Sequence, residues 1–146
     1  MDTVGTLLRE KGSSVLTTPA EATVLQAVEA MCAHKIGAVL VERDGAPAGI
    51  FSERDVMSRV ILTRKDPSTT KVADVMTREL VCIEPGTAAA EAMAIMTQRR
   101  CRHLPVVNEG KVVGMISIGD LVRWASRNQE FEIRMLTDYI SGKYPA

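Results

Sequence analysis

A serine followed three residues later by an aspartate occurs twice in this sequence, each time where a strand-like segment gives way to a helix-like one. Ser52 and Asp55 form the first pair, and Ser117 and Asp120 form the second. In such a pair, both side chains can satisfy free N–H groups at the first turn of a helix, as in a capping box. A helix N-terminus also attracts phosphate, and a carboxylate can accept hydrogen bonds from the two adjacent hydroxyl groups of a ribose. The spacing therefore indicates either two helix caps or two sites for a phosphorylated sugar.

The two pairs belong to a longer internal repeat. The segment Gly49–Asp55 returns 65 positions later as Gly114–Asp120. The match continues outside this motif, with an expected one-residue slip that pairs Gly37–Val41 with His103–Val107. Two copies are too few for a solenoid. We therefore expect one supersecondary unit built twice and packed about a pseudo-two-fold axis, with two similar sites facing each other.

Each repeat is predicted to run strand, helix, strand, strand, helix. In the first repeat, Thr23 and Gln26 form a capping box before an apolar stripe of helical spacing. Gly45 and Gly110 mark the turns between the paired strands. The elements expected in the first repeat are a strand near Val15–Thr18, a helix from Thr23, strands at Ala38–Val41 and Ala48–Ser52, and a helix over Glu53–Leu62 with Val56, Val60 and also Met57 turned inward. Those of the second repeat are a strand at Leu80–Ile83, a helix from Thr87, strands at Leu104–Val107 and Val112–Ser117, and a helix from Gly119 to about Arg127.

Further helices are expected outside the repeats. Thr3 caps a helix that runs to Lys11 and ends at Gly12, Ser13 and Ser14. A C-terminal helix over Gln129–Ile140 has Gly142 as its cap. The predicted boundaries are residues 1–14 for the N-terminal helix, 15–66 and 72–127 for the repeats, and 128–146 for the C-terminal helical tail.

Four motifs carry a family resemblance over most of the chain: Ile36–Ala38, Gly49–Asp55, Arg102–Val107 and Gly114–Asp120. With this order of elements, the sequence resembles a tandem CBS-domain pair, named after cystathionine β-synthase, of the small stand-alone type. The resemblance implies a mixed α+β fold of two βαββα repeats with extra N- and C-terminal helices. It also implies a regulatory, signal-transduction module that binds an adenosine nucleotide in the cleft between the repeats and dimerises through helical faces.

The resemblance implies that both serine–aspartate pairs contact phosphate and ribose. Arg54 is either a solvated residue of the helix start or a phosphate contact, and the second repeat has Gly119 in its place. Arg102 and His103 lie in the densest basic cluster of the chain. They either belong to a solvated helix end or contact the phosphate or ribose.

An adenine ring needs an apolar slot beside backbone groups that read its edge. Thr17 and Cys82 hold equivalent strand positions facing the two expected slots, and Cys82 departs from the hydroxyl residue that the family often has there. Lys35 either reaches a phosphate or stays on the surface. The residues expected to form the slots are Ile36, Gly37 and Ala38, with Leu104 and Pro105 as their counterparts.

Composition argues against several other functions. The 146 residues include 18 acidic and 18 basic side chains and have a formal net charge of zero. Duplex nucleic acids and anionic membranes call for a basic face, so neither is expected as a partner. No apolar run approaches the roughly 18 residues of a membrane span. The acidic start of the chain lacks an apolar signal core, which favours a cytoplasmic location.

The three cysteines, an odd number without a close-spaced pair, indicate reduced thiols. Cys101 and His103 lie two apart, but the further ligands of a metal site are not evident. No nucleophile–base pair stands out either. We therefore expect no metal, no catalytic cofactor and no enzymatic activity.

The function predicted from the sequence is nucleotide sensing. AMP is the expected ligand, and ADP, ATP or NAD are extended ligands of the same adenosine subsite. The alternative is a ligand-independent interaction or scaffold module, because the apolar C-terminal helix lies outside both repeats and needs a partner surface. The regulated partner protein is not identified by the sequence.

Overall fold

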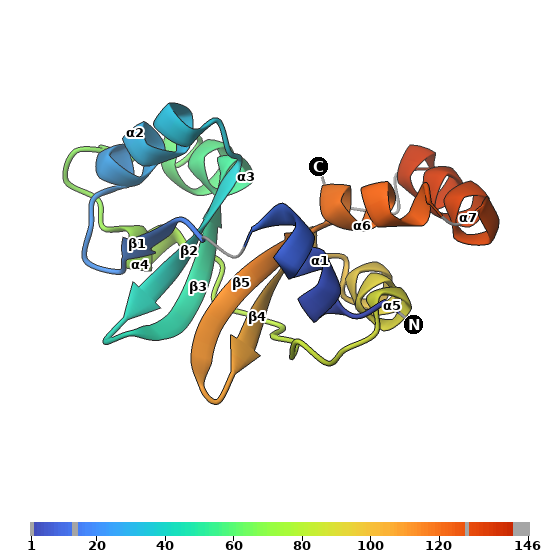
Figure 1. The fold of residues 1–146 in the computed structure, drawn as a ribbon. Helices are drawn as coiled ribbons and strands as arrows, with labels where there is room; N and C mark the ends of the chain where they lie inside the picture. Colours follow the sequence, from blue (N-terminus) through green and yellow to red (C-terminus); the bar gives the residue numbers. More distant parts are fainter. Residues whose placement is uncertain (1, 13–14, 128, 142–146) are drawn as a thin grey trace. The chain divides into compact units, whose positions relative to one another are not determined.

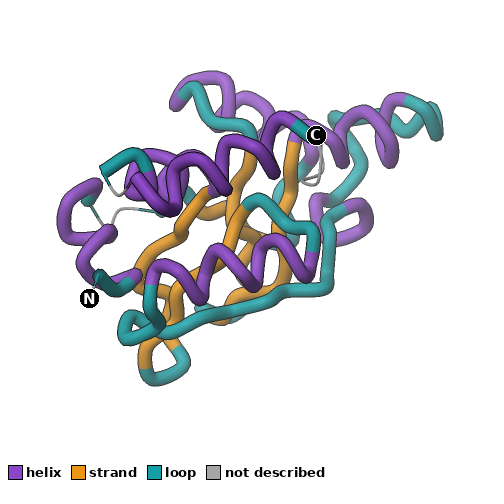
Figure 2. Tube along the Cα trace, turned by 90° about the vertical axis from the view of Figure 1, so that its right-hand side faces the viewer, coloured by secondary structure: helices purple, strands orange, loops and turns teal. Residues whose placement is uncertain are grey.

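The chain folds into two units that do not follow the order of the sequence. In the computed structural model, which describes residues 2–12, 15–127 and 129–141, one unit consists of residues 15–80. The other unit combines the N-terminal residues 1–14 with residues 81–146. Figure 1 shows the elements of each unit, and Figure 2 distinguishes the short strands from the helices.

The unit of residues 15–80 contains one three-stranded sheet of order β1-β2-β3. Strand β1 pairs in parallel with β2, and β2 pairs with β3 in antiparallel fashion. Asp44 and Gly45 both have positive φ at the β2–β3 turn, which matches the tight hairpin predicted there. The elements are β1 (Thr17–Pro19), α2 (Val24–His34), β2 (Ala38–Arg43), β3 (Ala46–Ser52), α3 (Glu53–Asp55), the π-helix η1 (Val56–Ile61) and α4 (Val72–Val75).

The other unit is built around the β4–β5 hairpin. Glu109 and Gly110 have positive φ at its turn. Thr3 caps the first helix of the chain, as predicted. The elements are α1 (Val4–Lys11), α5 (Ala89–Arg99), β4 (His103–Asn108), β5 (Lys111–Ser117), α6 (Ile118–Ala125) and α7 (Gln129–Ile140).

Two predicted elements are wrong in part. The strand expected at Leu80–Ile83 reduces to a single bridge between Ile83 and Val106. The helix expected over Glu53–Leu62 is one short α-helical turn followed by a π-helix, in which the Leu62 N–H donates to the Met57 carbonyl. Val60 is buried as expected, but Met57 is 61% exposed because the wider π-turn leaves it facing solvent.

The expected slip between the repeats is also wrong. Ala38 pairs with Ser52, and His103 pairs with Ser117, at the same spacing of 65 residues. Arg102 is therefore the structural equivalent of Gly37, and His103 that of Ala38. Similar apolar runs fit the slipped alignment as well, whereas strand pairing with the helix-start serines fixes the register.

Each unit has its own core, and each core includes residues of a helix that lies next to a repeat boundary in the sequence. Helix α1 buries Val4, Leu7 and Leu8 in the unit that contains β4 and β5. Helix α4, at the start of the second repeat, buries its apolar residues against β2, β3 and η1. Figure 1 shows α1 against β5 and α4 beside β3.

The described residues contain no helix long and apolar enough to cross a membrane. Ser13 and Ser14, where the N-terminal helix is predicted to end, and Gly142, the predicted cap of the C-terminal helix, lie outside the described residues.

Candidate functional site

The first serine–aspartate pair closes β3 and opens α3. Ser52 has extended backbone angles, and its Oγ accepts a hydrogen bond of 3.3 Å from the Asp55 N–H. The Ser52 N–H donates in return to Asp55 Oδ2 at 3.0 Å. This reciprocal pair is the predicted capping box, and it holds the carboxylate in one orientation at the first turn.

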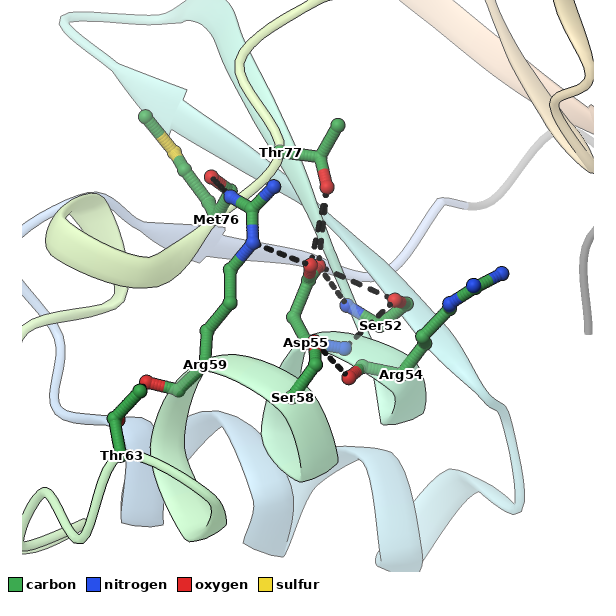
Figure 3. Close-up of polar contacts among 8 residues, drawn as sticks. All are labelled: Ser52, Arg54, Asp55, Ser58, Arg59, Thr63, Met76 and Thr77. Carbon is green, nitrogen blue, oxygen red and sulfur yellow. Dashed lines mark hydrogen bonds and ion pairs between the residues drawn. The ribbon is translucent and has the colours of Figure 1, made fainter.

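Two side chains that sequence reasoning missed also reach this carboxylate (Figure 3). The Thr77 hydroxyl donates to Asp55 Oδ1 at 3.1 Å, and the Arg59 Nε lies 3.6 Å from the same oxygen. Arg59 also donates to the Met76 carbonyl at 2.8 Å. The i,i+4 spacing from Asp55 could have identified Arg59. Thr77 follows α4 in the sequence, 22 residues after Asp55, so only the fold brings the two together. Asp55 itself is buried, with 4% exposure.

The second pair repeats the capping geometry with different partners. The Ser117 N–H donates to Asp120 Oδ2 at 2.8 Å, and Ser117 Oγ accepts from the Asp120 N–H at 3.1 Å. Lys11, the last residue of α1, places its Nζ 2.7 Å from the same oxygen and 3.0 Å from the Met115 carbonyl. Arg123 donates to the other oxygen. Asp120 is therefore a buried carboxylate that holds two cations.

These cations affect the titration of the site. Burial by itself would raise the pKa of Asp120, but the Lys11 ammonium and the Ser117 donors together hold it below its usual value. The pKa of His103 is lowered by burial first, and then by the positive charge of Arg102. Asp120 opposes that shift without cancelling it.

In the unit of residues 15–80, two of the other predicted residues, Gly37 and Ala38, adjoin the same helix start. The Gly37 carbonyl accepts from the Glu53 N–H at 3.0 Å, and Ala38 lies opposite Ser52. Thr17 pairs with Leu40 on β1 and is exposed. Lys35, Ile36 and Gly37 are exposed. Arg54 is exposed and points away from Asp55 (Figure 3).

In the other unit, the Arg102 carbonyl accepts from the Ile118 N–H at 2.8 Å, the same bond that joins Gly37 to Glu53. The Arg102 guanidinium lies 5.5 Å from the ring centre of Tyr139 on α7, and its Nε is buried without a hydrogen-bond partner among the described residues. Gly119 occupies the first turn of α6. The remaining predicted residues are exposed Cys82, half-buried His103, and buried Leu104 and Pro105.

The burial of Leu104 limits its proposed role. Its side chain is fully enclosed in the core of its unit, so it is not exposed to line a slot for the base. The Pro105 carbonyl is already used, because it accepts from the Ile83 N–H at 3.0 Å. In this repeat, Arg102 and His103 take the positions that Gly37 and Ala38 have in the other, which makes the two sites chemically different.

Comparison with known proteins shows the family. The model of the CBS domain matches residues 11–62 and 72–127. The chain belongs to the CBS-domain family. Each repeat is one CBS domain, and the two form a pair in one chain. CBS domains in general bind adenosine-containing ligands, and proteins of this type are usually regulatory rather than catalytic.

Three proteins illustrate the relatives and solved structures that this chain resembles. The CBS domain-containing protein CBSX3, mitochondrial, of Arabidopsis thaliana is 37% identical over 97% of this chain and 73% of its own length. A putative signal-transduction protein with CBS domains from Burkholderia ambifaria is 37% identical, with a TM-score of 0.82 over 88% of this chain and 96% of its own. A hexameric CBS-CP12 protein from bloom-forming cyanobacteria is 27% identical, with a TM-score of 0.73 over 83% of this chain and 69% of its own.

Proposed function

We propose that this CBS-domain pair is a regulatory module that binds an adenosine nucleotide. AMP is the ligand we propose first, and ADP, ATP or NAD would use the same adenosine subsite. The observation that carries the proposal is the pair of buried carboxylates, Asp55 and Asp120, each oriented by a serine at the first turn of a helix. A ribose offers two adjacent hydroxyl donors that suit such a carboxylate, and the helix start favours phosphate.

The other predicted residues complete the proposed sites. Thr17, Ile36 and Gly37 would contact the base, with Cys82 as the counterpart of Thr17, and Lys35 would reach a phosphate. Arg54 would rotate toward a phosphate, because it is exposed and is held by no ion pair among the described residues. In the second repeat, Arg102 and His103 supply polar groups for the phosphate or ribose.

Thermal unfolding with a panel of adenosine compounds tests the proposal. A ligand at about 100 times its dissociation constant should stabilise the protein by about 2.7 kcal/mol, which raises the unfolding midpoint by several degrees. The double variant Asp55→Ala, Asp120→Ala should lose this shift. Thr23→Ala is the matched control, because it removes a capping box of α2 away from both carboxylates. It should cost about 1 kcal/mol and keep the shift.

A second candidate function is a ligand-independent interaction module. It is favoured by α7, whose Leu136, Tyr139 and Ile140 are exposed, the last by 82%. The absence of a midpoint shift with every adenosine compound would favour this candidate and contradict the first.

The assembly and the location belong to the same proposal. We propose a homodimer formed through the helical face that carries Met57, Ile61 and Leu62, which are 61%, 59% and 77% exposed. A solution mass equal to that of one chain would contradict it. A cytoplasmic location and a regulated partner protein stay predictions.

A further inference from the structure

The two aspartates differ in the charge of the groups that donate to them. Asp55 accepts hydrogen bonds from Ser52 and Thr77, which are neutral donors, and the Arg59 Nε at 3.6 Å is beyond hydrogen-bond distance. Asp120 also accepts from its serine, but its other donors are the Lys11 ammonium at 2.7 Å and the Arg123 guanidinium.

This difference decides what a ribose must displace. At Asp55, a ribose hydroxyl would replace the Thr77 hydroxyl, which is a donor of the same kind and strength. At Asp120, it would have to replace an ammonium group. Charge-assisted hydrogen bonds are roughly twice as strong as neutral ones, so a neutral nucleoside gains too little to displace Lys11.

A phosphate changes this balance because it offers Lys11 another anion. A cavity of about 200 Å³ opens beside Asp120 between α1 and α6. Lys11, Arg123 and Arg127 are among its lining residues, together with Asp120 and Glu10. Arg127 is paired with Glu10 at 2.8 Å, which leaves Lys11 and Arg123 as the cations nearest the carboxylate. A phosphate in this cavity would attract both and release the Asp120 oxygens for the ribose.

We propose that Lys11 makes the second CBS domain selective for phosphorylated nucleosides, whereas the first accepts nucleosides and nucleotides alike. This inference rests on the proposed function, since it concerns the same carboxylates. The selective residue belongs to α1, which lies outside the second repeat in sequence and reaches Asp120 only through the fold.

Isothermal titration of the whole protein with adenosine and with AMP tests the inference. The unmodified protein should bind adenosine at one site per chain and AMP at two. Asp55→Ala should remove adenosine binding and leave one AMP site. Lys11→Met should create a second adenosine site, with affinity raised by about tenfold or more, because the charge-assisted bond to Asp120 Oδ2 is gone and only the largely exposed Arg123 remains, on the other oxygen. Lys11→Arg keeps the charge and should behave as the unmodified protein.

Lys71→Met is the matched control. Lys71 also forms an ion pair of 2.7 Å, with Glu21, but away from both aspartates, so its loss should change neither stoichiometry. Two equal adenosine sites in the unmodified protein would overturn the inference without affecting the proposed function, and this comparison needs no variant to fold. An unchanged adenosine affinity in Lys11→Met would do the same. Failure of both compounds to bind the unmodified protein and Lys11→Met would overturn both proposals.

Discussion

At the scale of single residues, the aspartates act in two ways that the sequence motif does not separate. Each carboxylate caps a helix, and each also receives donors from a distant segment: Thr77 in one unit and Lys11 in the other. The cap stabilises the local helix start. The distant donor ties a second element to it, so that a change at the carboxylate affects stability as well as ligand binding.

The pH dependence of stability should report on Asp120. Its pKa in the folded protein is lowered, so in the range just below the unfolded value of about 3.9 the unfolded chain binds more protons. Its contribution is therefore present above this value and is lost as the pH falls through the folded pKa. Asp120→Asn should cost about 1–3 kcal/mol near pH 6, because Lys11 and Arg123 lose their anion.

Urea unfolding of both proteins between pH 6 and pH 3 measures this effect. The difference in the free energy of unfolding should shrink at the acidic end. Asp74→Asn, which changes an exposed carboxylate on α4, is the control and should show little difference at either end. A gap of constant size across the range would contradict the assignment.

At the scale of the elements, the glycine of the repeated motif is required by close packing. A Cβ on Gly49 would lie 2.6 Å from the Met76 sulfur and 2.7 Å from the Thr77 carbonyl oxygen. A Cβ on Gly114 would lie 2.5 Å from a methyl group of Leu8. The segment at the end of α4 therefore packs against β3 at Gly49, and α1 packs against β5 at Gly114, because neither position carries a side chain.

The two glycines should tolerate alanine to different degrees. The Thr77 carbonyl accepts from the Ile50 N–H at 2.9 Å and is backbone, so it cannot move without breaking the bridge. The end of Leu8 can rotate. Gly49→Ala should therefore cost more than Gly114→Ala, with overpacking costs of about 1–3 kcal/mol. Gly86→Ala, where a Cβ meets nothing within 4 Å, is the control. Chemical denaturation gives the order, and equal losses at Gly49 and Gly86 would contradict this packing.

At the scale of the whole molecule, the sequence repeats and the folded units are different divisions of the chain. Leu8 lies at the start of the sequence but in the core of the unit with β4 and β5. Met76 lies at the start of the second repeat but in the core of the unit with β2 and β3. Both are nearly buried, at 5% and 3% exposure.

Truncation of these two side chains should therefore affect opposite units. Each change to alanine should cost about 2–5 kcal/mol, the usual loss for a buried Leu or Met. Hydrogen exchange should accelerate in β4 and β5 for Leu8→Ala, and in β2 and β3 for Met76→Ala. The two variants control for each other. Faster hydrogen exchange in β2 for Leu8→Ala, or in β4 for Met76→Ala, would contradict the division.

The sequence predicted most of the elements, because strand alternation, helix caps and turn glycines are local signals. It predicted the capping boxes at Thr23, Ser52 and Ser117, which the structure confirms. It did not predict the π-helix or the exposure of Met57, since both depend on how a helix meets its neighbours. The slip between repeats was wrong because apolar runs look alike in several registers.

The sequence by itself therefore determined the repeat, the family and the chemistry at two helix starts, because each depends on short motifs of neighbouring residues. Only the tertiary structure decided which donors reach the two carboxylates. Lys11 and Asp120 are 109 positions apart, and they meet where α1 packs against β5, with Leu8 beside the side-chain-free Gly114. Non-local packing of this kind leaves no periodic pattern in the sequence, yet it is what makes two similar motifs into two different sites.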